Sequence, residues 1–131
     1  MKLRKFGFFD ELSHEEAREV LVAARSEQPR PNEEKILGYL KDATPLLAVT
    51  TVLFDGLSDD RRPIGPYDIL TDGVWAWSSD AIYYVERYHI LVPPELQSHM
   101  AHNRWQCPPV TDFKNLELEG WGRLGPVGDQ G

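Results

Sequence analysis

Residues 67–77 read YDILTDGVWAW, and this stretch decides the fold. Two short runs of apolar and aromatic residues, 67–71 and 74–77, flank the dipeptide Asp72-Gly73. An Asp-Gly pair favours the positive φ angles of a type I′ turn, so the stretch predicts a tight β-hairpin. Alternation along the second strand places Trp75 and Trp77 on one face, where packing beneath the following helix is the expected outcome for such a pair.

Two helices are predicted upstream of the hairpin. Ser13 with a Glu three residues later has the spacing of a capping box, and the apolar periodicity behind it predicts a helix over 14–26. Asn32 is a suitable cap for a second helix, which Pro45 ends. We expect the charged residues of that helix, Glu33 among them, to face water.

The segment 46–54 is rich in β-branched and aromatic residues and has no charge. Such a run is typical of a central strand that is buried on both faces. The segment 55–66 that follows holds glycine, proline and charges of both signs without periodicity, which indicates a loop.

Two further helices are predicted after the hairpin. Ser78 or Ser79 can cap the first, which we expect to end near His89. Pro94 suits the first turn of the second, which runs to about Asn103.

These elements predict an α+β fold, with a small antiparallel sheet formed by the central strand and the Asp-Gly hairpin and packed with about four helices. Residues 1–119 are expected to form a single domain. Glycine and proline accumulate towards the end of the chain, and residues 120–131 are predicted to be a glycine-rich tail.

The composition limits the kinds of partner. The 131 residues include 14 basic and 21 acidic side chains, for a formal net charge of −7, which disfavours direct binding to nucleic acid. The single cysteine, Cys107, cannot form an intramolecular disulfide and favours a cytoplasmic location. No apolar run is long enough to span a membrane, and Asp10 and Glu11 interrupt the N-terminal run too early for a signal peptide.

Candidate chemistry is sparse. His99, His102 and Cys107 offer two imidazoles and a thiolate for a metal, but a tetrahedral site needs a fourth ligand, and two solvated histidines are the commoner outcome. No local signature supports the same cysteine as a nucleophile. Two prolines follow it, so it does not begin a helix whose dipole would stabilise a thiolate. Motifs for phosphate loops and for serine or zinc hydrolases are absent. We therefore expect a protein that is not an enzyme, with no catalytic residue, metal or cofactor.

Aromatic density near the hairpin suggests a binding surface instead. If some of these rings are exposed, nearby carboxylates would surround an aromatic patch that attracts a basic partner. The carboxylates also have a structural explanation, because Asp72 suits the turn and Asp80 suits the first turn of a helix. The residues predicted to bind a partner are Asp68, Asp72, Trp77, Asp80, Tyr83 and Glu86.

One third of the chain resembles a known class of protein. The pattern TDG-x-W-x-W at 71–77, SD at 79–80, YYV-x-x-YH at 83–89 and a proline-led final helix is similar to immunity proteins of bacterial polymorphic or contact-dependent toxin systems. Such proteins are small, acidic and α+β. The resemblance implies that the chain binds and neutralises a cognate toxin domain, whose surface the charge predicts to be basic.

Two alternatives stay open. The chain could be a non-catalytic adaptor or a homodimeric structural domain in which the aromatic residues are buried against a second copy. It could also be a small metal-dependent hydrolase that uses His99, His102 and Cys107.

Overall fold

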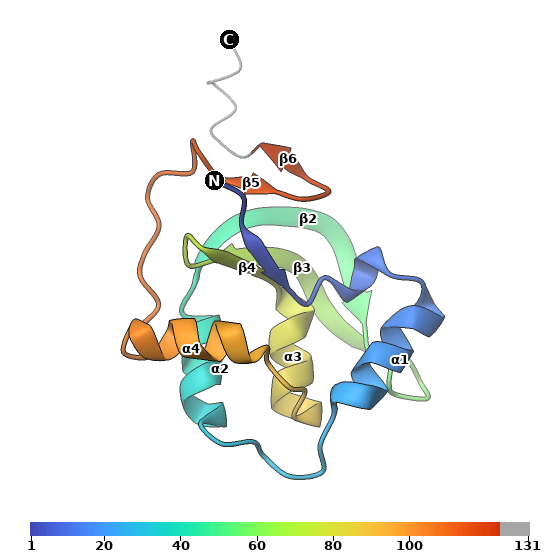
Figure 1. Ribbon diagram of the computed structural model, residues 1–131. Helices are drawn as coiled ribbons and strands as arrows, with labels where there is room; N and C mark the ends of the chain where they lie inside the picture. The colour runs from blue at the N-terminus through green and yellow to red at the C-terminus, as the bar shows by residue number, and fades with distance from the viewer. Residues whose placement is uncertain (124–131) are drawn as a thin grey trace.

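A four-stranded mixed sheet forms the middle layer of the molecule (Figure 1). The computed structural model describes residues 1–123. The strand order is β1-β4-β3-β2, in which β2, β3 and β4 pair antiparallel and β1 pairs parallel to β4. The strands are β1 (Arg4–Phe6), β2 (Thr44–Phe54), β3 (Pro63–Thr71) and β4 (Trp75–Ser78). The expected α+β class, with a small sheet and about four helices, is confirmed.

Helices cover one face of this sheet and the C-terminal segment covers the other. Figure 1 shows α2, α3 and α4 on one side, α1 beside them, and a small hairpin of β5 and β6 on the opposite side. The helical elements are η1 (Phe9–Glu11), α1 (His14–Ala24), α2 (Glu33–Lys41), α3 (Ser79–Tyr88) and α4 (Pro94–His102). The hairpin consists of β5 (Glu117–Leu118) and β6 (Gly122–Arg123).

The alternation of β4 separates two apolar cores. Trp75 and Trp77 are both buried on the helical side of the sheet, where they pack with residues of α2, α3 and α4. Ala76 points to the other side and packs with residues of β3 and of the C-terminal segment. The expectation that the two tryptophans share a face beneath a helix is therefore confirmed.

The β3–β4 hairpin is present, but its turn differs from the expected type I′. Gly73 has a positive φ of 96°, whereas Asp72 does not. The backbone N–H of Asp72 donates to the carbonyl of Trp75, so the turn lies over Gly73 and Val74. Asp72 contributes through its carboxylate instead, as described below.

β2 lies at the edge of the sheet rather than at its centre, so the expectation for 46–54 was wrong. Of its eleven residues only Leu53 is buried. Irregularities in the pairing with β3 interrupt the alternation, and Pro45, which cannot donate to a ladder, lies within this strand. The uncharged composition predicted a strand correctly but did not reveal which of its faces would be covered.

Helix boundaries agree with the sequence, but not all of the caps do. Ser13 Oγ accepts the backbone N–H of Glu16, as the capping box predicts. Asn32 has a left-handed φ of 63° and makes no capping bond with its side chain. The side chain of Glu33, expected to face water, lies instead against His89, whose Nδ1 is 2.7 Å from Glu33 Oε1. This contact joins the start of α2 to the end of α3.

Two segments close to the chain ends were not anticipated as part of the fold. β1 adds a fourth strand to the sheet beside β4. Residues 120–123, expected to begin a tail, belong to the β5–β6 hairpin region, and the ring of Trp121 packs edge to face on Tyr67. The remaining residues of that expected tail, 124–131, lie outside the described residues.

Candidate functional site

Half of the residues predicted to bind a partner are buried. Trp77 is 0% exposed, and its indole N–H donates to the carbonyl of Leu40, so it is a core residue and not an anchor. Asp72 and Asp80 are each 4% exposed and cannot present their charge on an open surface. Asp68 is half-buried, whereas Glu86 is exposed and forms an ion pair with Lys41. The predicted acidic and aromatic patch does not exist as one surface.

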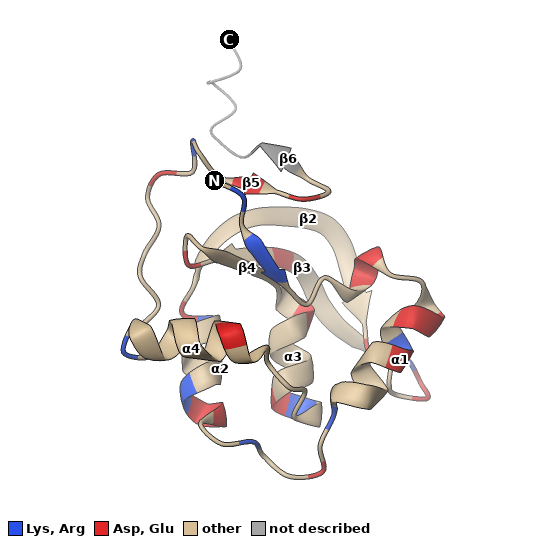
Figure 2. Ribbon diagram, viewed as in Figure 1, with Lys and Arg blue, Asp and Glu red and all other residues tan. Residues whose placement is uncertain are grey.

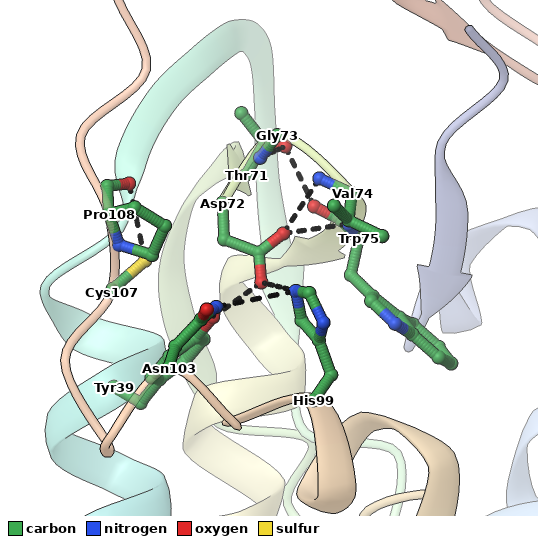
Figure 3. A network of polar contacts seen from close by, with 10 residues as sticks. All are labelled: Tyr39, Thr71, Asp72, Gly73, Val74, Trp75, His99, Asn103, Cys107 and Pro108. Carbon is green, nitrogen blue, oxygen red and sulfur yellow. Dashed lines mark hydrogen bonds and ion pairs between the residues drawn. The ribbon is translucent and has the colours of Figure 1, made fainter. Parts of the chain in front are cut away.

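Asp72 is the centre of a buried hydrogen-bond network (Figure 3). Its Oδ1 accepts the backbone N–H groups of Val74 and Trp75 at 2.9 and 2.7 Å. Its Oδ2 accepts the Tyr39 hydroxyl at 2.6 Å and lies 3.2 Å from Nε2 of His99. The carboxylate thereby ties the hairpin turn to α2 and α4. All of these donors come from the chain itself, so the network holds structure together.

His99 and Cys107 do not assemble the chemistry that was considered for them. The thiol of Cys107 is buried, which raises its pKa to about 12, so the nucleophilic thiolate is scarce at neutral pH. Its hydrogen bond goes to the carbonyl of Pro108, and Figure 3 shows it separated from His99 by Tyr39 and Asn103. Within residues 1–123, no three His, Cys, Asp or Glu side chains are grouped so as to hold a metal ion.

Tyr83 is half-buried, and its hydroxyl is hydrogen-bonded to another residue of the chain. Its hydroxyl donates to Oδ2 of Asp55 at 2.6 Å, and the hydroxyl of Tyr88 donates to the same oxygen at 2.7 Å. Burial alone would raise the pKa of Asp55, but these hydrogen bonds and two from backbone N–H groups lower it below its ordinary value. Asp55 thus fixes the start of the β2–β3 loop, residues 55–62, against α3. Tyr83 is therefore a tie between elements and not a free anchor.

Asp80 differs, because it faces a cavity of about 170 Å³. The cavity lies between η1, α1, the end of β2 and the start of α3, and we call it the Asp80 cavity. Burial raises the pKa of Asp80 to about 6, and the charge of Asp10 adds to this rise. Hydrogen bonds from the Ser78 hydroxyl and from the backbone N–H groups of Asp80 and Ala81 oppose it. A strongly perturbed carboxyl group in a cavity is a typical mark of a functional site.

The mouth of the Asp80 cavity is apolar. Leu12, Val52 and Phe54 line it while remaining 38%, 52% and 49% exposed. Exposed apolar side chains that gather in one place, unlike single ones, indicate a binding surface. Sequence reasoning missed these residues, since only the uncharged run ending at Phe54 marked them.

Acidic side chains surround this mouth. We call the region formed by η1, α1, the end of β2 and the loop 55–62 the α1 end. Figure 2 shows acidic residues along η1, α1 and the loop. The exposed ones that form no ion pair within the described residues are Asp10, Glu15, Glu16, Glu19 and Asp59, and Asp60 pairs with Arg62 at 3.7 Å. The three arginines of the region are outnumbered, and Arg18 donates to the carbonyl of Gly56. The α1 end therefore combines apolar contact area with negative charge.

Comparison of the chain with protein-family models, with curated proteins and with solved structures finds no match. Among the described helices, none combines the length and the apolar character needed to cross a membrane.

Proposed function

We propose that this chain is an immunity-type binding protein that neutralises a toxin domain by docking it on the α1 end. The observation that carries the proposal is the grouping of Leu12, Val52 and Phe54 around a cavity whose surroundings are acidic. Apolar anchors at the centre with charges around them are typical of interfaces that combine affinity with fast association. The net charge of −7 supports a basic partner.

An inhibitor acts by occupying its partner and needs no turnover. This fits the chemistry of the described residues, in which Asp72 and Asp55 are occupied by internal donors and Cys107 is a buried thiol of raised pKa. The binding surface differs from the one expected from sequence, since it lies on α1 and the end of β2 rather than on the hairpin.

The proposal is tested by affinity capture from the native cells, with mass spectrometry of what the chain retains after a moderate salt wash. Three baits are compared: the natural chain, Phe54→Asp, and Leu91→Asp as a control. Leu91 is 44% exposed, similar to Phe54, but lies outside the Asp80 cavity. We expect the natural chain and Leu91→Asp to retain one stoichiometric basic protein, and Phe54→Asp to lose it.

The captured partner is then purified, and its activity is measured with and without the natural chain. Inhibition at a one-to-one ratio supports the immunity role. Recovery of the same partner with all three baits would place the interface elsewhere, and recovery of the chain alone would overturn the proposal.

One observation favours a second function, self-association as an adaptor or homodimer. No strand within the described residues pairs with the outer edge of β2, and none of its eleven residues is charged. Natural edge strands commonly carry charges that prevent pairing with another chain. Light scattering tests this alternative, because a dimer that dissociates in Ala48→Lys would assign the β2 edge to a second copy.

A further inference from the structure

The Asp80 cavity has the size of one side chain. Pockets for drug-sized ligands are roughly 300–1,000 Å³, well above the 170 Å³ found here. A volume of that order corresponds to about five or six water molecules. The cavity therefore suits a single extended group that enters through the mouth formed by Leu12, Val52 and Phe54.

Asp80 at the base of the cavity has no cation to balance it. Its Oδ1 accepts the Ser78 hydroxyl, and the carboxylate also accepts backbone N–H groups of Asp80 and Ala81, but all of these donors are neutral. No Lys, Arg or His of residues 1–121 forms an ion pair with it. A carboxylate that is 4% exposed and has only neutral donors keeps part of its desolvation cost, and a bound cation would reduce that cost.

The walls suit an aliphatic chain that carries such a cation. Phe9, Leu21 and the ring of Tyr84 line the interior, and the apolar mouth lies above them. Lysine and arginine side chains combine an apolar stem with a charged head in this order. A ligand with a cation at its tip would place the stem against these walls and the charge at Asp80.

Other charged groups also face the cavity, and they decide how selective it is. Asp10 adds a second negative charge, Arg61 supplies a positive one, and the imidazole of His14 also lines the cavity. Arg61 has a positive φ of 45° at the loop and makes no ion pair with Asp10 or Asp80. Its guanidinium is therefore a competitor for an incoming cation and not a permanent partner of the carboxylate.

We propose that the Asp80 cavity receives the lysine or arginine side chain of the protein that docks on the α1 end. This inference rests on the proposed function for the identity of the partner. The preference of the cavity for an alkyl cation is independent of that function and is testable with the chain alone.

The experiment is an NMR titration of the natural chain at about pH 7.5, where Asp80 is ionised. The probes are n-butylammonium and n-butylguanidinium, with butyrate and 1-butanol as an anion and a neutral molecule of similar length. We expect the cations to shift the resonances of Asp80 and Tyr84 and to bind at least about tenfold more tightly than butyrate or 1-butanol. The stronger of the two cations indicates whether lysine or arginine is preferred.

Variants assign the binding to the carboxylate. Asp80→Asn keeps the acceptor for Ser78 and should weaken cation binding by about tenfold or more. Asp42→Asn, an exposed acidic residue outside the cavity, should leave it unchanged. Arg61→Ala should strengthen it by removing the competing guanidinium. An amide spectrum of each variant confirms the fold before titration.

Two results would overturn the inference: an affinity for butyrate equal to that for the cations, or an undiminished affinity for the cations in a folded Asp80→Asn variant. The two proposals fail separately. If a partner is captured through Phe54 but the cavity shows no preference for cations, the proposed function stands and the inference is overturned. If the cavity binds cations but no partner is captured, the proposed function is overturned, and only the preference of the cavity for an alkyl cation remains.

Discussion

Asp72 and Asp80 are eight residues apart and equally buried, but their surroundings are opposite. Asp72 accepts two backbone N–H groups and a tyrosine hydroxyl and lies beside a histidine, so its charge is fully stabilised by the chain. Asp80 accepts one side-chain hydroxyl and the backbone N–H groups at the start of α3, but it faces a cavity and forms no ion pair with a histidine, lysine or arginine of the described residues. Burial alone therefore does not distinguish a structural carboxylate from a binding one. The open space beside the carboxylate does.

The largest effect is expected for Asp72→Ala. The substitution leaves two backbone N–H groups, the Tyr39 hydroxyl and His99 without their acceptor in a buried site. We expect the free energy of unfolding to fall by about 3–5 kcal/mol, measured by urea denaturation. Asp42→Ala at an exposed position is the control. A loss below about 1 kcal/mol would show that the network is not structural.

Asp80→Asn should have the opposite sign. The folded pKa of about 6 lies above the unfolded value of roughly 3.9, so the folded state binds a proton more tightly between these pH values. The natural chain therefore loses stability as the pH rises through this window, by about 2–3 kcal/mol in total.

An asparagine at position 80 does not titrate, so the variant should be more stable than the natural chain above about pH 6 and equal to it below about pH 4. Urea denaturation across this range measures the difference. A variant that is less stable at pH 7 would mean that Asp80 is stabilised by the chain in the same way as Asp72.

Tyr83→Phe examines an intermediate case. Asp55 would keep the Tyr88 hydroxyl and two backbone donors after losing one of its four. We expect a loss of about 1–2 kcal/mol, the usual range for one hydrogen bond to a charged group. The pKa of Asp55, followed by NMR, should rise, since the tyrosine hydrogen bond lowers it. An unchanged pKa would contradict this assignment.

The smallest effect is expected for Glu86→Gln. Its ion pair with Lys41 is 2.8 Å long but both side chains are about half exposed. Pairs of this kind contribute little, and we expect a change below about 0.5 kcal/mol in the same urea assay. A larger loss would mean that an exposed carboxylate can contribute to the free energy of unfolding as a buried one such as Asp72 does.

The hairpin, the helices and the α+β class could be predicted because each depends on residues close together in sequence. Ser13 caps its own helix, and Gly73 supplies the positive φ of its own turn. The edge position of β2 could not be predicted in this way. It depends on where the fourth strand joins the sheet: β1 pairs with β4 across some 70 residues, and within the described residues no strand pairs with the outer side of β2.

The candidate site depends more than the fold does on residues that are far apart in sequence. Asp10, Val52 and Asp80 line one cavity, yet they come from three elements that only the folded sheet brings together. Asp80 itself was among the residues predicted to bind, but as a surface charge. The sequence favoured carboxylates near the hairpin, but their burial depends on contacts between distant elements: α2 and α4 enclose Asp72, and η1 lies beside Asp80.

The C-terminal segment has a consequence for synthesis of the protein on the ribosome. Leu116 and Leu118 cover the face of the sheet that includes Tyr67 and Ile69, and β5 is hydrogen-bonded to the N-terminal residues Met1 and Leu3. The strands are translated before this cover exists. A nascent chain that ends near residue 105 is therefore expected to expose one apolar face of a nearly complete sheet, and to be prone to aggregation until residues 116–118 have been synthesised and cover that face.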